Sequence, residues 1–146
     1  MKRLHMHIRV EDLDRSIEFY STVFGAAPDI VEPDYAKWLL DEPAANIAIS
    51  SHAGETPGID HVGVQTDSRE ALDEISARLR AAGEATFDQE ATTCCYAVGD
   101  KTWVEDPSGV RWETFFTTGQ SAVYGVDASR KGLETGKAPA PPRTCC

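Results

Sequence analysis

The chain lacks the features that mark several large classes of protein. It has no run approaching the roughly 18 apolar residues that a membrane-spanning helix needs. No apolar stretch follows its basic N-terminal residues, so we expect no secretory signal and a cytoplasmic protein. Basic residues are not in excess, because 14 Lys and Arg stand against 24 Asp and Glu and leave a net charge of −10. We therefore expect neither nucleic acid nor a membrane surface as a partner.

The chain also lacks the dispersed cysteines of a disulfide-stabilised miniprotein. Its four cysteines form two adjacent pairs, Cys94-Cys95 and Cys145-Cys146. Adjacent cysteines can close only small, strained rings. Without an export signal, we expect these thiols to be reduced. With 146 residues, of which 41% are apolar and 26% charged, the composition is that of a soluble globular chain.

The sequence does contain a repeated order of elements. Alternating residues around His5 predict a strand, and Asp12 predicts the N-cap of a helix after it. The order restarts at His61, whose strand precedes a helix capped by Ser68. Superposing His5 on His61 also superposes Asp12 on Ser68. Further strands are expected at about 27–32, 35–41 and 45–51 in the first half, and at about 85–91, 94–98, 101–105 and 110–116 in the second.

The repeat defines the expected domain. It predicts an α+β domain over residues 1–116, with one module at about 1–53 and another at about 59–116. The modules could pair within one chain or between two, so we expect a monomer or a homodimer. Residues 117–146 hold few large apolar side chains and predict a flexible tail that ends in Cys145-Cys146.

Strand alternation places residues of metal-binding types on one side of the sheet. Met6 and its alternate neighbours suit the face that packs under a helix, which turns His5 and His7 to the other face. His61 takes the matching position in the second module. In the last strand, the core pattern turns Glu113 to the same side, where a carboxylate is costly to bury unless it is paired or metal-bound. Structural histidines and an exposed glutamate are the alternatives.

Several short stretches carry a family resemblance: His5-Met6-His7-Ile8-Arg9-Val10-Glu11-Asp12-Leu13, Phe19-Tyr20, Phe24-Gly25, Asp60-His61-Val62-Gly63-Val64 and Asp106-Pro107-Ser108-Gly109. Residues 4–116 resemble the vicinal oxygen chelate superfamily, which includes glyoxalases, extradiol dioxygenases and antibiotic-resistance proteins. The resemblance implies paired βαβββ modules that form an open, cupped sheet. It also implies that His5, His61 and Glu113 are metal ligands inside the cup.

The ligand types indicate which metal to expect. Two imidazoles and one carboxylate match the facial triad of non-haem Fe(II) oxygenases, which leaves positions open. We therefore expect Fe(II) as the cofactor and O₂ as the co-substrate. Glyoxalase-like members usually add a carboxylate on the last strand of the first module, but Asn46-Ile47-Ala48-Ile49-Ser50 has none. This departure favours an oxygenase.

The stretch Thr92-Thr93-Cys94-Cys95-Tyr96 carries a second kind of chemistry. Two neighbouring thiolates are soft donors that suit trivalent arsenic, Cd(II) or Cu(I). A pair of buried, inert cysteines is the alternative. With the triad and the following Asp100-Lys101-Thr102-Trp103-Val104, the stretch resembles the carbon–arsenic lyases that degrade organoarsenicals, and the related cadmium-induced proteins. That branch implies that Cys94 and Cys95 bind the arsenical.

Other residues are candidates for smaller roles. His7, Tyr96 and Lys101 are possible pocket residues, with ordinary structural or surface placement as the alternative. Cys145 and Cys146 could relay arsenic to or from the site, or have no role.

The sequence thus leads to one main hypothesis and two alternatives. The main one is a non-haem Fe(II)-dependent dioxygenase that cleaves the carbon–arsenic bond of trivalent organoarsenicals, such as methylarsenite and reduced aromatic arsenicals, and releases arsenite. One alternative is a thiol protein that sequesters cadmium or arsenic. The other is a glyoxalase-like metal-dependent lyase or thiol transferase.

Overall fold

The computed structural model describes residues 1–125 of the chain. Its elements are β1 (Arg3–Arg9), α1 (Leu13–Phe24), β2 (Ile30–Glu32), β3 (Tyr35–Asp41), β4 (Ala44–Ser50), β5 (Gly58–Gln65), α2 (Arg69–Ala81), β6 (Phe87–Cys94), β7 (Ala97–Glu105) and β8 (Arg111–Gln120). A strand, a helix and three strands therefore follow one another twice. None of the helices in this part of the chain is both long and apolar enough to span a membrane.

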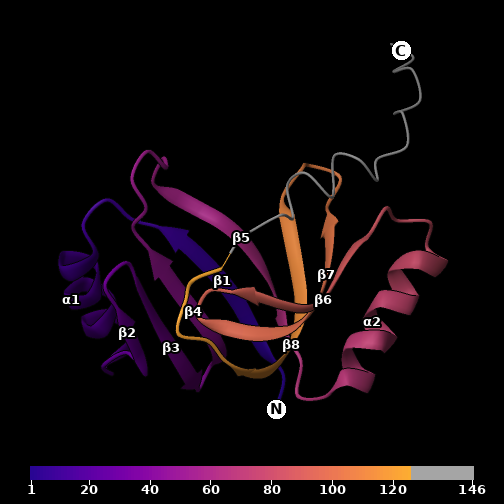
Figure 1. Ribbon diagram of the computed structural model, residues 1–146, viewed down its shortest axis with the longest axis horizontal. Coiled ribbons are helices and arrows are strands. Elements are labelled where there is room, and N and C mark those ends of the chain that lie inside the picture. The colour runs from indigo at the N-terminus through magenta and orange to yellow at the C-terminus, as the bar shows by residue number, and fades with distance from the viewer. Residues whose placement is uncertain (126–146) are drawn as a thin grey trace, which may run out of the picture.

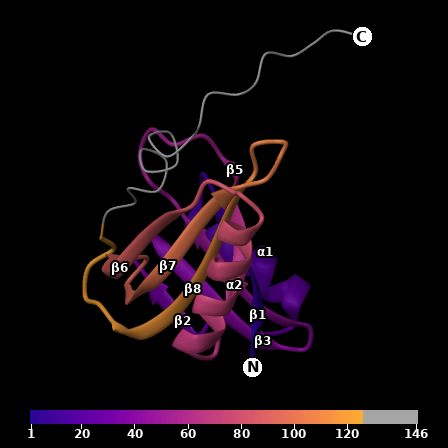
Figure 2. The ribbon, with the colours of Figure 1, turned by 90° about the vertical axis from the view of Figure 1, so that its right-hand side faces the viewer.

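The eight strands form one sheet with the order β2-β3-β4-β1-β5-β8-β7-β6. Each module opens with a strand that lies parallel to its own last strand, β1 beside β4 and β5 beside β8. The modules meet where β1 and β5 pair antiparallel. The sheet curves into an open cup, with the helices on its outer side at opposite ends (Figures 1 and 2). The predicted α+β fold of paired βαβββ modules is confirmed, and in this chain the modules pair with each other.

Both helices begin at the predicted caps. The carboxylate of Asp12 accepts a hydrogen bond of 3.0 Å from the backbone N–H of Arg15. The hydroxyl of Ser68 accepts one of 3.1 Å from the N–H of Ala71. These bonds satisfy backbone donors that have no partner within the helix.

The outer face of the first module buries its apolar residues under α1. Ala36, Trp38 and Ile49 are completely buried, and Ile8 and Val10 pack against them. Because side chains alternate along a strand, this packing turns the two histidines of β1 to the concave face, as predicted.

Two strand irregularities bring additional side chains into the cup. His7 pairs with His61 but Ile8 pairs with Ile59, so Asp60 is an extra residue in β5. A bulge of this kind allows two consecutive residues to face the same side. In β6, the pair Gln89–Lys101 is followed by Thr92–Gly99, so this strand also contains one extra residue. That bulge shifts the alternation and places Cys94 on the same face as Lys101.

The structure corrects two local expectations. One strand, β7, replaces the two that were expected at 94–98 and 101–105. Cys94 ends β6, and Cys95 and Tyr96 form the two-residue turn before β7, with φ of 57° and 59°. The flexible tail was expected from residue 117, but β8 continues to Gln120, because backbone pairing with β7 needs no apolar side chains. The rest of the expected tail, residues 126–146 with Cys145 and Cys146, lies outside the described residues.

Candidate metal and thiol site

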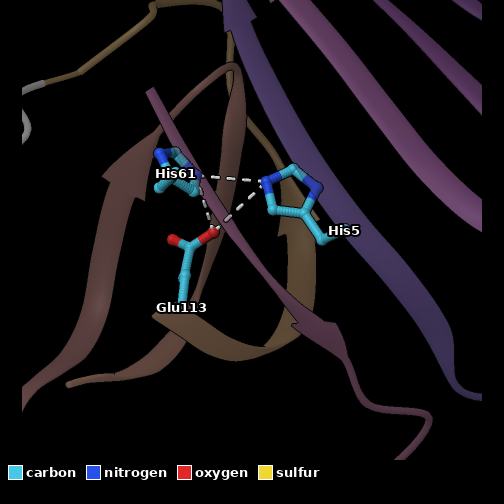
Figure 3. Close-up of side chains that lie close together, drawn as sticks. All are labelled: His5, His61 and Glu113. Atoms are coloured by element: carbon cyan, nitrogen blue, oxygen red, sulfur yellow. Dashed lines mark hydrogen bonds and ion pairs between the residues drawn. The ribbon is translucent and has the colours of Figure 1, made fainter. Parts of the chain in front are cut away.

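The three predicted ligands come from three neighbouring strands at the centre of the sheet. His5 lies on β1, His61 on β5 and Glu113 on β8, and all three are buried. Their side chains converge (Figure 3): His5 Nε2 lies 3.2 Å from His61 Nε2, and Glu113 Oε2 lies 3.5 Å and 3.3 Å from these two nitrogens. Alternation along the strands therefore placed all three correctly on the concave face.

A glycine allows the strands to come this close. Gly63 pairs with His5 on one side and with Glu113 on the other. A Cβ atom at Gly63 would lie 1.9 Å from the backbone oxygen of Glu113. Any side chain here would push β8 away from β5, so glycine is required for the observed spacing.

The far nitrogen of each imidazole is held by an acceptor. His5 Nδ1 lies 2.9 Å from the carbonyl oxygen of Asn46, and His61 Nδ1 lies 2.7 Å from Asp60 Oδ2. Each Nδ1 therefore carries a proton and donates it, which leaves Nε2 as the lone-pair nitrogen of the neutral ring. When both rings are neutral, two such lone pairs and a carboxylate oxygen face one another, and a cation between them would satisfy all three. This donor set fits a divalent transition metal.

Burial and mutual contacts shift the pKa values of the three clustered side chains. Burial and the nearby His61 lower the pKa of His5 to about 4. Burial acts in the same direction on His61, but hydrogen bonds to Asp60 and Glu113 outweigh it and raise the pKa to about 8. The pKa of Glu113 lies well below its ordinary value, because Lys101 and His61 outweigh the effect of burial. In the metal-free cluster, the proton that His61 holds at neutral pH therefore lies between the Glu113 carboxylate and the neutral His5 ring, where a metal cation would replace it.

Lys101 is a buried partner of the triad. Its side chain is only 9% exposed, and its Nζ donates a 2.5 Å hydrogen bond to Glu113 Oε1. The Glu113 carboxylate outweighs burial and raises the pKa of Lys101, which therefore carries its charge. Because Oε1 is engaged, only Oε2 faces the histidines. This arrangement favours coordination through a single carboxylate oxygen and leaves room for other ligands.

β6 ends at Cys94 and Cys95 follows it, so the thiol pair lies at the tip of the β6–β7 hairpin. This hairpin curls over the cup (Figure 1). Cys94 and Cys95 are not joined by a disulfide, and their sulfurs are 3.1 Å apart. The hydrogen bond to Cys94 and burial raise the pKa of Cys95 well above its ordinary value. The turn is anchored to the first module, because the Tyr96 hydroxyl donates a 2.6 Å hydrogen bond to Asp34.

Both sulfur-bearing residues line two adjoining cavities. The larger, of about 560 Å³, also reaches His61 and Trp103. The smaller, of about 30 Å³, also reaches His5 and Glu113. The thiols and the imidazole–carboxylate cluster therefore share one concave region, whose size is typical of a small-molecule site.

The remaining candidates fall in different places. His7 lines both cavities and lies 2.9 Å from the Ser50 hydroxyl through its Nε2. Lys101 lines the smaller cavity. Tyr96 lines neither of these two cavities, and its role in the structure is to hold the turn.

Asp60 and Tyr124 are among the residues of the site that were not predicted. Asp60 orients His61 and is itself held by Arg111, whose Nη2 donates a 2.6 Å hydrogen bond to Asp60 Oδ2. Strict alternation would turn Asp60 outward, and only the bulge brings it into the cup. Tyr124 lines the larger cavity from within the expected tail. The adjacent sequence has no periodicity that would have revealed it.

Comparison with known proteins agrees with this geometry. The model of the Glyoxalase/Bleomycin resistance protein/Dioxygenase superfamily matches residues 2–114, so the chain belongs to that superfamily. The trivalent organoarsenical cleaving enzyme of Bacillus sp. (strain MD1) is 43% identical over 120 residues, which cover 80% of this chain and 74% of that protein. The cadmium-induced protein CadI of Mycobacterium bovis is 32% identical over 146 residues, which cover 100% of this chain and 93% of CadI.

A solved structure shares the fold. An extradiol ring-cleaving dioxygenase from B. fuscum matches with a TM-score of 0.61 at 22% identity, over 81% of this chain and 33% of that chain. The resemblance to the superfamily, and to its organoarsenical-cleaving and cadmium-induced branch, is thereby confirmed.

Proposed function

We propose that the protein is a cytoplasmic, Fe(II)-dependent enzyme that uses O₂ to cleave the carbon–arsenic bond of trivalent organoarsenicals and release arsenite. Methylarsenite and reduced aromatic arsenicals are the proposed substrates. The observation that carries the proposal is the shared concave region in which Cys94 and Cys95 lie beside His5, His61 and Glu113. The names of the organoarsenical-cleaving relatives support it.

The thiols would capture the substrate by exchange at arsenic. A trivalent arsenical with one organic group R carries two hydroxyls, R–As(OH)₂. Each thiol forms one As–S bond, one As–O bond breaks, and the thiol proton leaves with the hydroxyl as water. Two sulfurs 3.1 Å apart can both bind one arsenic atom, which stays trivalent. The remaining bond is the As–C bond, and fixing it in the cavity removes much of the entropic barrier to reaction.

The buried polar residues would prepare the metal centre. His5, His61 and Glu113 would hold Fe(II), and bound iron would supply the activation of O₂. The Asn46 carbonyl and the Asp60 carboxylate keep the Nε2 atoms of both histidines directed inward. Lys101 keeps Glu113 turned so that Oε2 faces these nitrogens. The Trp103 and Phe115 rings lie against the imidazoles, where they exclude water.

A sequestering thiol protein is the second candidate, and the similarity to CadI over the whole chain favours it. Sequestration needs the thiols alone, however, and does not account for the buried triad. A glyoxalase-like enzyme is less well supported. The residues of β4 that line the small cavity, Asn46 and Ala48, provide no further carboxylate.

The test is arsenic speciation after incubation of the full-length protein with methylarsenite. The protein is loaded with Fe(II), and parallel samples are kept with and without O₂. We expect arsenite only when Fe(II) and O₂ are both present. Stable one-to-one binding without arsenite release under every condition would favour sequestration and contradict the proposal.

The chain offers a matched pair of control variants. Cys94→Ser/Cys95→Ser and Cys145→Ser/Cys146→Ser each remove one adjacent thiol pair. We expect arsenite release to stop in the first variant and to continue in the second when arsenical is supplied in excess.

A further inference from the structure

The segment after β8, residues Ser121–Gly125, lies against the thiol turn. The Ser121 N–H donates a 2.9 Å hydrogen bond to the Tyr96 carbonyl oxygen, and Gly125 forms an antiparallel bridge with Cys94. Gly125 has φ of 86°, and a Cβ atom there would lie 1.9 Å from the Thr93 carbonyl oxygen. Only glycine fits this approach, so the backbone around Tyr124 is held in place.

Tyr124 connects the thiol turn to the first module. Its ring centroid lies 4.4 Å from that of His52, 5.7 Å from Tyr96 and 6.1 Å from Tyr35. These edge-on arrangements are those that aromatic pairs prefer. The side chains of Cys95 and Ser50 also lie close to that of Tyr124. Tyr124 and Cys95 also line the same cavity of about 560 Å³. The aromatic ring is thus fixed beside one of the two arsenic-binding sulfurs.

The chemistry of capture fixes where the organic group must go. Once both thiols have bound the arsenic, its third bond leads to carbon, and the organic group must extend away from the sulfurs. Of the two cavities next to the sulfurs, only the larger has room for an organic group. His61 on β5 and Trp103 on β7 line it from the sheet, and His52 and Tyr124 line it from the loops. A substituent directed into this cavity therefore meets the ring of Tyr124.

We propose that Tyr124 is a specificity-determining residue, whose ring forms the wall against which the organic group of a thiol-bound arsenical packs. This inference rests on the proposed capture of arsenicals by Cys94 and Cys95. An aryl group gains contact with the wall, whereas a methyl group is too small to use it fully. The protein therefore prefers aryl over methyl arsenicals, and the preference depends on Tyr124.

The preference can be measured by binding, without turnover. Phenylarsenite and methylarsenite are each titrated into the full-length, metal-free protein under anaerobic conditions, in competition with a small dithiol. We expect Tyr124→Ala to weaken phenylarsenite binding by about tenfold and methylarsenite binding by less than about threefold. Tyr124→Phe keeps the ring and should retain the preference. Val123→Ala changes a neighbouring side chain that is 62% exposed and should change neither affinity.

The remaining outcomes separate this inference from the proposed function. An unchanged ratio of phenylarsenite to methylarsenite affinity in Tyr124→Ala would overturn the inference. If both affinities fall by the same factor, Tyr124 only positions the thiol turn. Tyr124→Leu provides a second ringless variant if Tyr124→Ala does not fold. If the wild-type protein binds both arsenicals with the expected preference but releases no arsenite, the proposed cleavage fails and the inference stands. If Cys94→Ser/Cys95→Ser still binds like the wild type when Cys145 and Cys146 are also replaced by serine, both fail.

Discussion

The imidazole–carboxylate cluster and the thiol pair share one concave region, but the backbone beneath them differs. His5, His61 and Glu113 project from paired strands at the centre of the sheet, and both imidazoles are held by hydrogen bonds that they donate to neighbouring residues. Cys94 ends an edge strand and Cys95 belongs to a tight turn with left-handed φ. The proposed ligands are therefore held by the sheet. The thiol turn is held by contacts with other elements, namely the Tyr96–Asp34 hydrogen bond and the backbone of Ser121 and Gly125.

This difference has a chemical consequence. A metal centre needs fixed donor geometry, which central strands provide. The proposed exchange of hydroxyl groups on arsenic for sulfur requires that the site admit substrate and release product, and segments at a sheet edge open more readily than central strands. Substitutions in the imidazole–carboxylate cluster should therefore leave the thiol site intact, and substitutions of the thiols should leave metal binding intact.

The largest loss of metal binding and activity is expected from substitution of the proposed metal ligands. His5→Ala, His61→Ala and Glu113→Ala should each remove Fe(II) binding and activity together but leave a folded domain, since the outer apolar core is untouched. Asp60→Asn only weakens the orientation of His61 and should reduce metal affinity by about 10–100-fold. Iron stoichiometry and circular dichroism provide the measurements. His7→Gln is the matched control, a buried histidine outside the triad, and should keep its iron. Unchanged iron content in all three alanine variants would eliminate the triad.

The thiol pair should show the opposite pattern. Cys94→Ser/Cys95→Ser should retain Fe(II) but lower kcat/KM for methylarsenite by at least about 100-fold, because the substrate is no longer held near the metal. Serine keeps the approximate size of the side chain, so a packing role alone predicts only mild destabilisation. Loss of iron in this variant would show that the thiols belong to the metal centre, and the comparison would break down.

The sequence predicted the regular parts of this arrangement. Alternation in β1 and β8 correctly turned His5 and Glu113 into the cup, because neither strand is interrupted before these residues. It missed Asp60, because a bulge changes the facing of a residue without a clear mark in the sequence. The repeat and the caps at Asp12 and Ser68 were sufficient to place both helices.

The thiol turn was harder to predict. Cys95 and Tyr96 adopt left-handed φ without the Asn or Gly that usually indicates such a turn, so the cysteines were expected in a strand. The extra residue in β6 also reverses the side on which Cys94 faces. That bulge is held by a distant group, since Asp100 Oδ1 accepts a 2.8 Å hydrogen bond from the Ala91 N–H. Tyr124 was missed because a backbone bridge at Gly125 and ring contacts with distant residues hold it, and neither leaves a periodic pattern in the sequence.

Lys101 lines the small cavity that the imidazole–carboxylate cluster and the thiol pair share, and its removal should sharpen the comparison. Lys101→Met leaves Glu113 buried without its cation, which should cost the metal-free protein about 3–5 kcal/mol of unfolding free energy. A bound divalent metal supplies positive charge to the same carboxylate, so the loss should be smaller in the metal-loaded protein. Thermal unfolding with and without metal measures the difference. An equal loss in both forms would show that Lys101 stabilises packing and not the charge on Glu113.

The smallest effect is expected from deletion of residues 126–146, which removes Cys145 and Cys146 but keeps every described contact of the site. If these thiols relay arsenic, the deletion should lower the rate severalfold at arsenical concentrations far below KM and leave kcat unchanged, since a tethered thiol raises the local concentration of substrate. Cys145→Ser/Cys146→Ser should reproduce the deletion. Deletion of residues 119–146 also removes Tyr124 and the end of β8, so it should lower kcat and destabilise the fold as well. A rate that is equal to the wild type at all concentrations after the shorter deletion would exclude the relay and confine arsenic capture to Cys94 and Cys95.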